Sequence, residues 1–298
     1  MRWLALLGVN LFAAFCFVAI KIGLAYAPPL AFGGLRALLG GASLLIVAAA
    51  TGQRVRPARQ DLPTLTLLGL TATTATYGAM FGSPALMDAG LASVLGNVQP
   101  LLILVFAAMM LGEPLTRPKL LALLAGLAGV ALILSPSFGP ASRGAGMGAG
   151  LALTASAGAA LGSILFKRSK VRTGVVATTG WQLTIGSVPL LAAAMIWSGP
   201  QVRWTAEFLG LLAFLALLGT ALPTTLWFWL LQREEDAGRL SMFLFLTPVL
   251  GLASGVAVLG DRIRLIQGLG VLVIAGGLFA VSEKPRSWRR PSVPLQRQ

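Results

Sequence analysis

Apolar residues along this chain are gathered into ten long stretches, separated by short segments that contain glycine, proline or basic residues. Each stretch comes close to the roughly 20 mainly apolar residues that an α-helix needs to cross a bilayer. The pattern therefore predicts ten transmembrane helices, at about residues 3–26, 29–50, 62–87, 91–111, 120–134, 147–166, 175–197, 208–231, 240–259 and 265–281.

The second half of this pattern repeats the first. At a spacing of 148 residues, Asp88-Ala89-Gly90 returns as Asp236-Ala237-Gly238, Pro100 as Pro248, Leu111-Gly112-Glu113 as Leu259-Gly260-Asp261 and Gly129 as Gly277. Nearer the N-terminus the spacing is 146, which places Lys21 on Lys167, Gly34 on Gly180 and Arg36 on Gln182. Internal repeats of apolar segments are typical of transporters. We predict a first five-helix repeat over residues 1–135, a linker over 136–147, a second five-helix repeat over 148–282 and a basic cytoplasmic tail over 283–298.

The odd number of helices in the repeated unit has a geometrical consequence. Two tandem copies of such a unit enter the membrane from opposite faces, so a pseudo-two-fold axis in the membrane plane relates them. Of the 23 Lys and Arg residues, 17 fall in the termini and loops of one side, which the positive-inside rule assigns to the cytoplasm. The expected fold class is an all-α membrane protein of ten transmembrane helices, arranged as two inverted five-helix repeats around a central cavity, with both termini cytoplasmic.

The composition narrows the classes of function. With 56% hydrophobic and 11% charged residues, the chain has too little polar surface for a soluble globule. A net charge of +14 is typical of nucleic-acid-binding proteins, but the basic residues lie in short loops, so we expect no nucleic-acid partner. Histidine is absent and Cys16 is the single cysteine, which excludes histidine chemistry and an intrachain disulfide. We expect no cofactor and no metal; the expected partners are the lipid bilayer and a small-molecule substrate.

The duplicated motifs, together with a cation in the second apolar stretch, resemble a known family. Leu111-Gly112-Glu113 with Gly129, and Leu259-Gly260-Asp261 with Gly277, are similar to motifs of the EamA-type drug/metabolite transporters. The whole chain is most like the aromatic amino-acid exporters of the YddG type within that family. The resemblance implies a basket-shaped bundle in the bacterial inner membrane that exports amino acids and related metabolites. Asp261 departs from the more common Glu at its position.

Two cations lie inside apolar stretches, Lys21 and Arg36. A charge in hydrocarbon costs several kcal/mol, so an intramembrane ionisable residue is by default a functional candidate. Both residues are expected near the outer ends of their helices, where a long side chain can also snorkel to the interface. The functional interpretation is that they attract a substrate carboxylate.

Polar and aromatic side chains recur on shared helical faces. Thr73, Tyr77 and Phe81 follow one another four residues apart, so they lie on one side of a helix. The amide side chains of Asn97, Gln99 and Gln182 are candidates for a different reason, since an amide in lipid must find a hydrogen-bond partner. The alternative for each hydroxyl is a bond to a backbone carbonyl, and for each aromatic ring ordinary packing in the bundle. The predicted substrate-binding residues are Asn10, Arg36, Thr73, Tyr77, Phe81, Ser93, Asn97, Gln99, Trp181, Gln182, Thr224 and Trp227.

Two further pairs of equivalent residues carry a structural expectation. Pro100 and Pro248 interrupt the hydrogen bonding of the fourth and ninth stretches and are candidate hinges. Glu113 and Asp261 precede the fifth and tenth stretches, where a carboxylate suits the N-terminus of the helix that follows.

The acidic residues bear on energy coupling. All nine fall in loops or at helix ends, whereas a proton- or sodium-driven pump usually needs a carboxylate near the midplane. We therefore predict facilitated rather than proton-coupled export, by alternating access in a monomer. Three alternatives stay open: an exporter of another metabolite or drug, a membrane-embedded lipid-modifying enzyme, and an assembly subunit.

Overall fold

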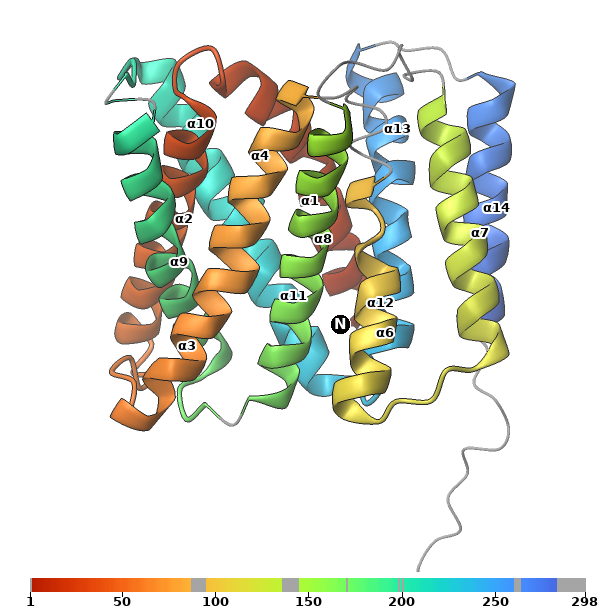
Figure 1. Ribbon diagram of the computed structural model, residues 1–298, viewed down its shortest axis with the longest axis horizontal. Coiled ribbons are helices and arrows are strands. Elements are labelled where there is room, and N and C mark those ends of the chain that lie inside the picture. The colour runs from red at the N-terminus through yellow and green to blue at the C-terminus, as the bar shows by residue number, and fades with distance from the viewer. Residues whose placement is uncertain are drawn as a thin grey trace, which may run out of the picture.

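The protein is described here by a computed structural model that covers residues 2–86, 95–135, 145–169, 171–197, 199, 201–259 and 264–282. Throughout these residues the regular secondary structure is helical. The helices stand side by side in a bundle, with α2 and α9 near one edge and α7 and α14 at the other (Figure 1). The all-α prediction is confirmed for the described residues.

The helices of the first half follow the predicted stretches closely. They are α1 (Arg2–Gly23), α2 (Pro29–Ala50), the short η1 (Arg59–Asp61), α3 (Leu62–Leu68), η2 (Gly69–Ala75), α4 (Thr76–Leu86), α6 (Gln99–Leu111) and α7 (Arg117–Leu134). Pro29 suits the first turn of α2 because that turn needs no N–H donor from it. Gly112 ends α6 in the left-handed conformation, at φ 69°, which glycine adopts without strain.

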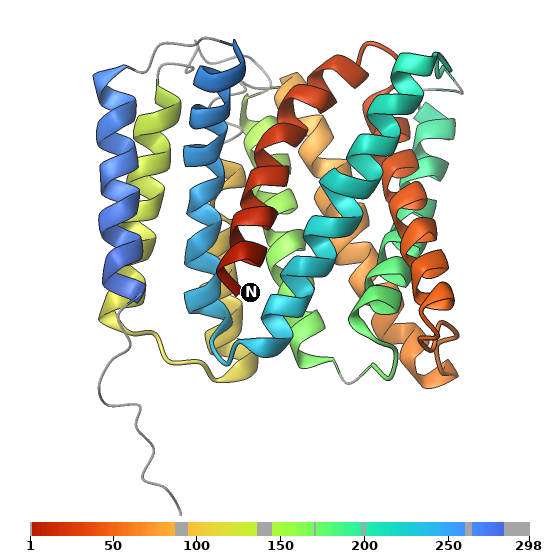
Figure 2. The ribbon, with the colours of Figure 1, turned by 180° about the vertical axis from the view of Figure 1, so that it is seen from behind.

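The second half is also a series of helices interrupted by one π segment. They are α8 (Ala145–Arg168), α9 (Val175–Trp197), α10 (Ala206–Ala216), η4 (Leu217–Ala221), α11 (Leu222–Arg233), α12 (Ala237–Met242), η5 (Phe243–Phe245), α13 (Leu246–Leu259) and α14 (Leu265–Ser282). Seen from behind, α1 lies between α13 and the continuous run of α10 and α11 (Figure 2).

Five helical stretches of the described chain are long and apolar enough to cross a membrane on their own. They are Pro29–Ala50, Arg117–Leu134, Gly146–Arg168, Val175–Trp197 and Ala206–Arg233. Shorter apolar helices cover Gln99–Leu111, Ala237–Leu250 and Leu265–Ala280, where the fourth, ninth and tenth stretches are predicted. A helical membrane bundle accounts for these lengths, and the count of ten crossings stays a prediction.

Two of the long runs contain a π-helical segment, which the hydrophobic pattern did not predict. The segment η2 separates α3 from α4, and η4 separates α10 from α11. A π segment takes up an extra residue within a helix and is frequently found at functional sites. Both segments carry a buried threonine, Thr73 in η2 and Thr220 in η4.

The two candidate hinge prolines each follow a break in the helix. Pro100 lies in the first turn of α6, just after a turn at residues 97–98, and Pro248 lies in the first turn of α13, just after the 3₁₀ segment η5. Proline fits there because it lacks the N–H that an inner helical position would need. Movement about these points remains a prediction.

Glycine allows two pairs of helices to approach closely. In the α2–α9 pair, a β-carbon on Gly34 would lie 2.8 Å from Leu191, and one on Gly180 would lie 2.9 Å from Leu45. In the α7–α14 pair, a β-carbon on Gly129 would lie 2.6 Å from the Gly270 carbonyl oxygen. In both pairs the contact residues rise along one helix as they fall along the other, so the paired helices are antiparallel.

Candidate functional site

The candidate site is centred on Arg36, which lies two turns into α2 and is only 4% exposed. Its Nε donates a hydrogen bond of 2.9 Å to Thr220 Oγ1 in η4. The guanidinium lies over the ring of Tyr77, with Cζ 4.8 Å from the ring centroid, and its Cζ is 6.0 Å from the centroid of Phe81. Rings in this position stabilise a buried cation through their negative faces.

The guanidinium keeps unused hydrogen-bonding capacity. Within the described part of the chain, no group accepts a hydrogen bond from Arg36 Nη1, and no carboxylate forms a salt bridge with this side chain. A buried charge without an opposite charge is unfavourable because the low-dielectric interior replaces water poorly. An anionic ligand group at this nitrogen would relieve that cost.

A second polar side chain, Gln182 of α9, is 1% exposed, and only one of its two amide atoms has a hydrogen-bond partner among the described residues. Its Nε2 donates a hydrogen bond of 2.6 Å to Thr73 Oγ1 in η2. Its Oε1 lacks a donor among the described residues, as does the hydroxyl of Thr184 on the same helix. Buried polar groups normally have partners, so each of these exceptions needs an explanation.

The stripe predicted on the third apolar stretch connects the two side chains. Thr73 contacts Gln182, and Tyr77 and Phe81 contact Arg36. Next to Thr220 in sequence, the carbonyl oxygen of Gly219 in η4 accepts a hydrogen bond from the thiol of Cys16, with 3.6 Å between sulfur and oxygen. We call the group Arg36, Thr73, Tyr77, Phe81, Gln182 and Thr220 the central polar cluster.

Three of the other predicted residues bind partners elsewhere in the protein. Asn10 donates to Leu6 O at 2.7 Å and accepts from Thr247 Oγ1 at 2.7 Å, which ties α1 to α13. Trp181 Nε1 donates to Val55 O at 2.8 Å, and Trp227 Nε1 donates to Ser163 Oγ at 3.0 Å. Each of these side chains therefore has a hydrogen-bond partner within the protein, and its role in binding substrate stays a prediction.

The remaining predicted residues are placed less fully. Asn97, Gln99 and Thr224 are half-buried. Ser93 lies outside the described residues, as does the side chain of Lys21, whose backbone belongs to α1. Thr220 belongs to the central polar cluster although sequence reasoning did not select it. Its spacing from Thr224 and Trp227 was visible, but that spacing does not indicate which hydroxyl meets a distant partner.

A second group of charged side chains lies where the loops meet, and we call it the loop ion cluster. Glu113 accepts hydrogen bonds from the backbone N–H groups of Ala237 at 2.8 Å and Gly238 at 3.0 Å, and Lys167 Nζ lies 3.1 Å from its Oε1. The expectation that Glu113 suits the helix that follows it was wrong. The carboxylate serves the N-terminus of α12, because the chain fold brings that more distant helix to it. Asp261, its equivalent, lies outside the described residues.

Asp236 completes the loop ion cluster as the N-cap of α12. Its Oδ1 accepts from the backbone N–H of Arg239 at 2.7 Å, and Oδ2 lies 2.8 Å from Lys119 Nζ. Burial alone would raise the pKa of this carboxyl group. The hydrogen bonds from Lys119 and from the Arg239 backbone outweigh burial and hold the pKa below its ordinary value of 3.8.

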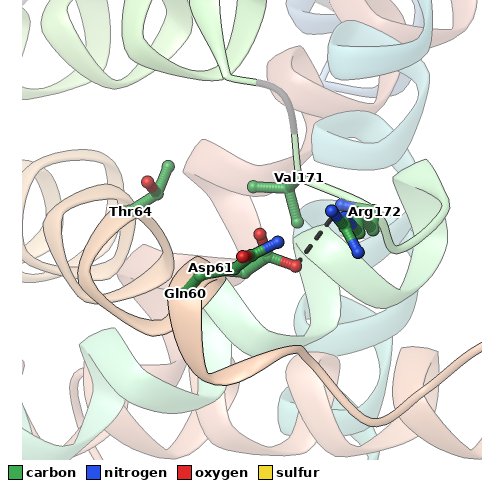
Figure 3. Close-up of a pocket in the computed structure, with 5 residues that line it drawn as sticks. All are labelled: Gln60, Asp61, Thr64, Val171 and Arg172. Atoms are coloured by element: carbon green, nitrogen blue, oxygen red, sulfur yellow. Dashed lines mark hydrogen bonds between the residues drawn. The ribbon is translucent and has the colours of Figure 1, made fainter.

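An open pocket of about 430 Å³ lies at the same end of the bundle as the start of α3. It is lined by Gln60, Asp61, Thr64, Val171 and Arg172, and Figure 3 shows Gln60 and Asp61 facing Arg172. The backbone N–H of Arg172 donates to Asp61 Oδ2 at 3.5 Å. None of the predicted site residues lines this pocket.

Comparison with known proteins identifies what the chain is similar to. The model of the EamA-like transporter family matches residues 2–135 and 146–283. An uncharacterized transporter of Bacillus subtilis, YvbV, is 31% identical over 92% of this chain and 89% of its own length. A probable amino-acid metabolite efflux pump of Escherichia coli is 30% identical, and the match covers 88% of each chain. A solved crystal structure with 22% identity superposes with a TM-score of 0.81 over 94% of this chain and 96% of its own, which shows the shared fold.

Proposed function

We propose that this protein exports aromatic or other neutral amino acids and related metabolites by alternating access. The chain belongs to the EamA-like transporter family and is a membrane transporter. The observation that carries the proposal is Arg36, a buried cation with aromatic rings beside it and with one nitrogen, Nη1, that has no hydrogen-bond partner among the described residues. Amino acids carry the carboxylate that such a nitrogen binds and, in the aromatic ones, a ring that packs on Tyr77 and Phe81. The relative from Escherichia coli is named a probable amino-acid metabolite efflux pump, which agrees with this substrate class.

Alternating access requires two halves that exchange roles, and the α2–α9 contact supports an inverted repeat. At the spacing of 146, Gly34 is equivalent to Gly180 and Leu45 to Leu191. The contact of Gly34 with Leu191 and the contact of Gly180 with Leu45 are therefore the same contact seen from each half. A two-fold axis between two antiparallel helices produces such a pair.

The α7–α14 contact repeats this relation at the other edge of the bundle. At the spacing of 148, Gly129 is equivalent to Gly277 and Ala122 to Gly270. A β-carbon on Gly129 would lie 2.6 Å from Gly270 O, and one on Gly277 would lie 3.2 Å from Ala122 O, so the two contacts are again equivalent. The π segments agree as well, because η2 and η4 begin at residues 69 and 217, which are 148 apart. Two inverted five-helix repeats, divided near residues 135 and 148, are the simplest account of all three relations.

The remaining features of the proposal follow from the charges. The two termini and the segments around residues 54–59, 117–119, 167–172 and 233–239 together carry 17 of the 23 Lys and Arg residues, so we place them in the cytoplasm of a bacterium, and the protein in its inner membrane. The described carboxylates, which are Asp61, Glu113, Glu207, Glu234, Glu235 and Asp236, lie in loops or at helix ends. A proton- or sodium-driven pump usually needs a carboxylate near the midplane, so we propose a facilitator driven by the substrate gradient. Ten predicted crossings in one chain are enough to enclose a path, so we propose that the protein acts as a monomer.

The test is transport into liposomes that hold the purified protein. We expect uptake of labelled phenylalanine, no acceleration by an imposed proton gradient, and a larger loss of uptake for carboxylated than for uncharged substrates in Arg36→Ala. Acceleration by the gradient contradicts facilitated transport. Equal losses for both kinds of substrate assign Arg36 to folding.

Rival substrates are tested in the same preparation. Uptake of nucleosides or sugars in place of amino acids supports the alternative of another metabolite or drug as cargo. The alternative of a lipid-modifying enzyme is dropped, because the family and the named relatives are transporters and not enzymes.

A further inference from the structure

Arg36 and Gln182 occupy equivalent positions in the two halves of the chain. They are 146 residues apart, the same spacing that relates Gly34 to Gly180. Arg36 of α2 donates to Thr220 in η4, and Gln182 of α9 donates to Thr73 in η2. Helices α2 and α9 are the second predicted crossings of their halves, and η2 and η4 belong to the third. In each bond, the second crossing of one half therefore contacts the third crossing of the other half. The two donors are thus equivalent and bond to equivalent π segments, although the two acceptor threonines are offset by one residue at the spacing of 148 that relates those segments.

The two equivalent side chains differ in chemistry and not in setting. Both are more than nine-tenths buried, and each has one terminal polar atom that lacks a partner among the described residues. In Arg36 this atom is Nη1, a donor that carries positive charge. In Gln182 the amide nitrogen is engaged by Thr73, so the free atom is Oε1, a neutral acceptor. The two equivalent positions therefore offer a ligand a cationic donor at Arg36 and a neutral acceptor at Gln182.

The partners of the two side chains lie close together on one helical run. Gln182 bonds to Thr73 and Arg36 lies over Tyr77, and these two residues are four apart on the same helical run. Arg36 and Gln182 therefore contact neighbouring turns of the same run. An α-amino acid carries its carboxylate and ammonium groups on one carbon, so it offers an acceptor for Nη1 and a donor for Oε1 within one small molecule.

We propose that Arg36 and Gln182 bind the opposite ends of a zwitterionic α-amino acid, with Arg36 Nη1 donating to the carboxylate and Gln182 Oε1 accepting from the ammonium group. This inference rests on the proposed function and specifies its substrate class. A ligand without a carboxylate leaves the buried guanidinium uncompensated, and a ligand without an ammonium group leaves Oε1 without a donor. Sites built to hydrogen-bond a substrate group reject analogues that lack it far more strongly than apolar pockets do.

Competition assays test the two ends separately. Labelled phenylalanine uptake into liposomes is challenged with unlabelled phenylalanine, with phenylalanine amide, which lacks the carboxylate, and with 3-phenylpropanoate, which lacks the ammonium group and has no hydrogen-bond donor in its place. In the wild type we expect phenylalanine to compete at least about tenfold better than either analogue, as the loss of one charge-assisted hydrogen bond implies. We expect Gln182→Leu to abolish the preference over 3-phenylpropanoate alone, and Arg36→Gln to abolish the preference over phenylalanine amide alone.

Two further variants sharpen the test. Exchanging the side chains in Arg36→Gln/Gln182→Arg restores one cation and one acceptor, and we expect it to recover both preferences at least in part. Thr179→Val is the matched control, because its hydroxyl bonds within α9 to Val175 O at 2.8 Å, and we expect unchanged preferences. For a variant with little uptake, ligand-induced thermal stabilisation of the protein in detergent gives the same ranking.

The outcomes separate this inference from the proposed function. If the wild type transports phenylalanine but both single variants weaken all three competitors alike, the zwitterion site is refuted and amino-acid export stands. If the wild type neither transports nor binds phenylalanine, both fail together. Selective loss of one preference in each single variant supports the site.

Discussion

The central polar cluster and the loop ion cluster are both built around a buried charge, but their hydrogen bonding differs. Glu113 accepts from two backbone N–H groups and pairs with Lys167. Arg36 bonds to one threonine, lies over aromatic rings and keeps Nη1 unpartnered among the described residues. A buried charge that the protein satisfies fully contributes to holding the fold together, whereas one that it satisfies in part is available to a ligand.

The largest expected effect is on stability, from removal of the satisfied charge. Glu113→Ala removes the carboxylate that pairs with Lys167, which keeps only its bond to Glu235 O, and leaves two N–H groups of α12 without an acceptor, so we expect the free energy of unfolding to fall by about 3–5 kcal/mol. Unfolding of the purified protein in detergent measures it. Glu235→Ala is the control, because that side chain is exposed, and its effect should stay within about 0.5 kcal/mol. A loss no larger than the control's would remove the distinction between the clusters.

Removal of the charge of Arg36 should have the opposite effect on stability. Arg36→Met replaces an incompletely paired cation with an apolar side chain of similar length, and such exchanges are often neutral or stabilising. We expect the unfolding temperature to be kept or raised, while phenylalanine uptake falls at least about tenfold, equivalent to about 1.4 kcal/mol. A severe loss of stability with unchanged uptake per folded molecule would assign Arg36 to the fold.

A smaller effect is expected from the group that holds Arg36. Thr220→Val keeps the shape of the side chain but removes the acceptor for Nε, so the guanidinium is less well positioned and half-saturation for phenylalanine should rise about fivefold. Thr220→Ser should restore the wild-type value because it keeps the hydroxyl. Thr225→Val is the matched control, since that hydroxyl bonds to Ala221 O at 2.7 Å within its own helical run.

The smallest effect is that of pH on the loop ion cluster. Because the pKa of Asp236 is lowered on folding, the stabilisation by this carboxylate is complete above the ordinary value of 3.8 and is lost as the pH falls through the lower folded-state pKa. We expect the unfolding temperatures of the wild type and Asp236→Asn to differ near pH 6 and to converge toward pH 3. A constant difference across this range would contradict the assignment.

The helices and the candidate role of Arg36 could be predicted from the sequence. Apolar stretches predict crossings because hydrocarbon allows only a backbone that satisfies its own hydrogen bonds. Arg36 stood out because a charge in such a stretch is costly. The pairing of Gly34 with Leu191 and of Gly180 with Leu45 could not be predicted in detail, although the repeat that relates the two contacts was visible.

What the sequence did not reveal depends on contacts between distant segments. A π segment changes the register by one residue and leaves an apolar run equally apolar, so η2 and η4 have no mark in the hydrophobic pattern. Thr220 and Thr225 have the same side chain, yet one bonds to Arg36 and the other to its own helix. Glu113 sits beside one helix in sequence and caps another in space, which only the folded arrangement decides.

The contact of Cys16 with η4 has a practical consequence. Because this is the only thiol in the chain, the unmodified protein can be alkylated at one place, next to the residue that precedes Thr220. A maleimide reaches the buried sulfur only when α1 and η4 separate. The rate of alkylation, measured in intact vesicles with and without substrate, therefore reports how often α1 and η4 separate. No engineered cysteine is needed for this measurement.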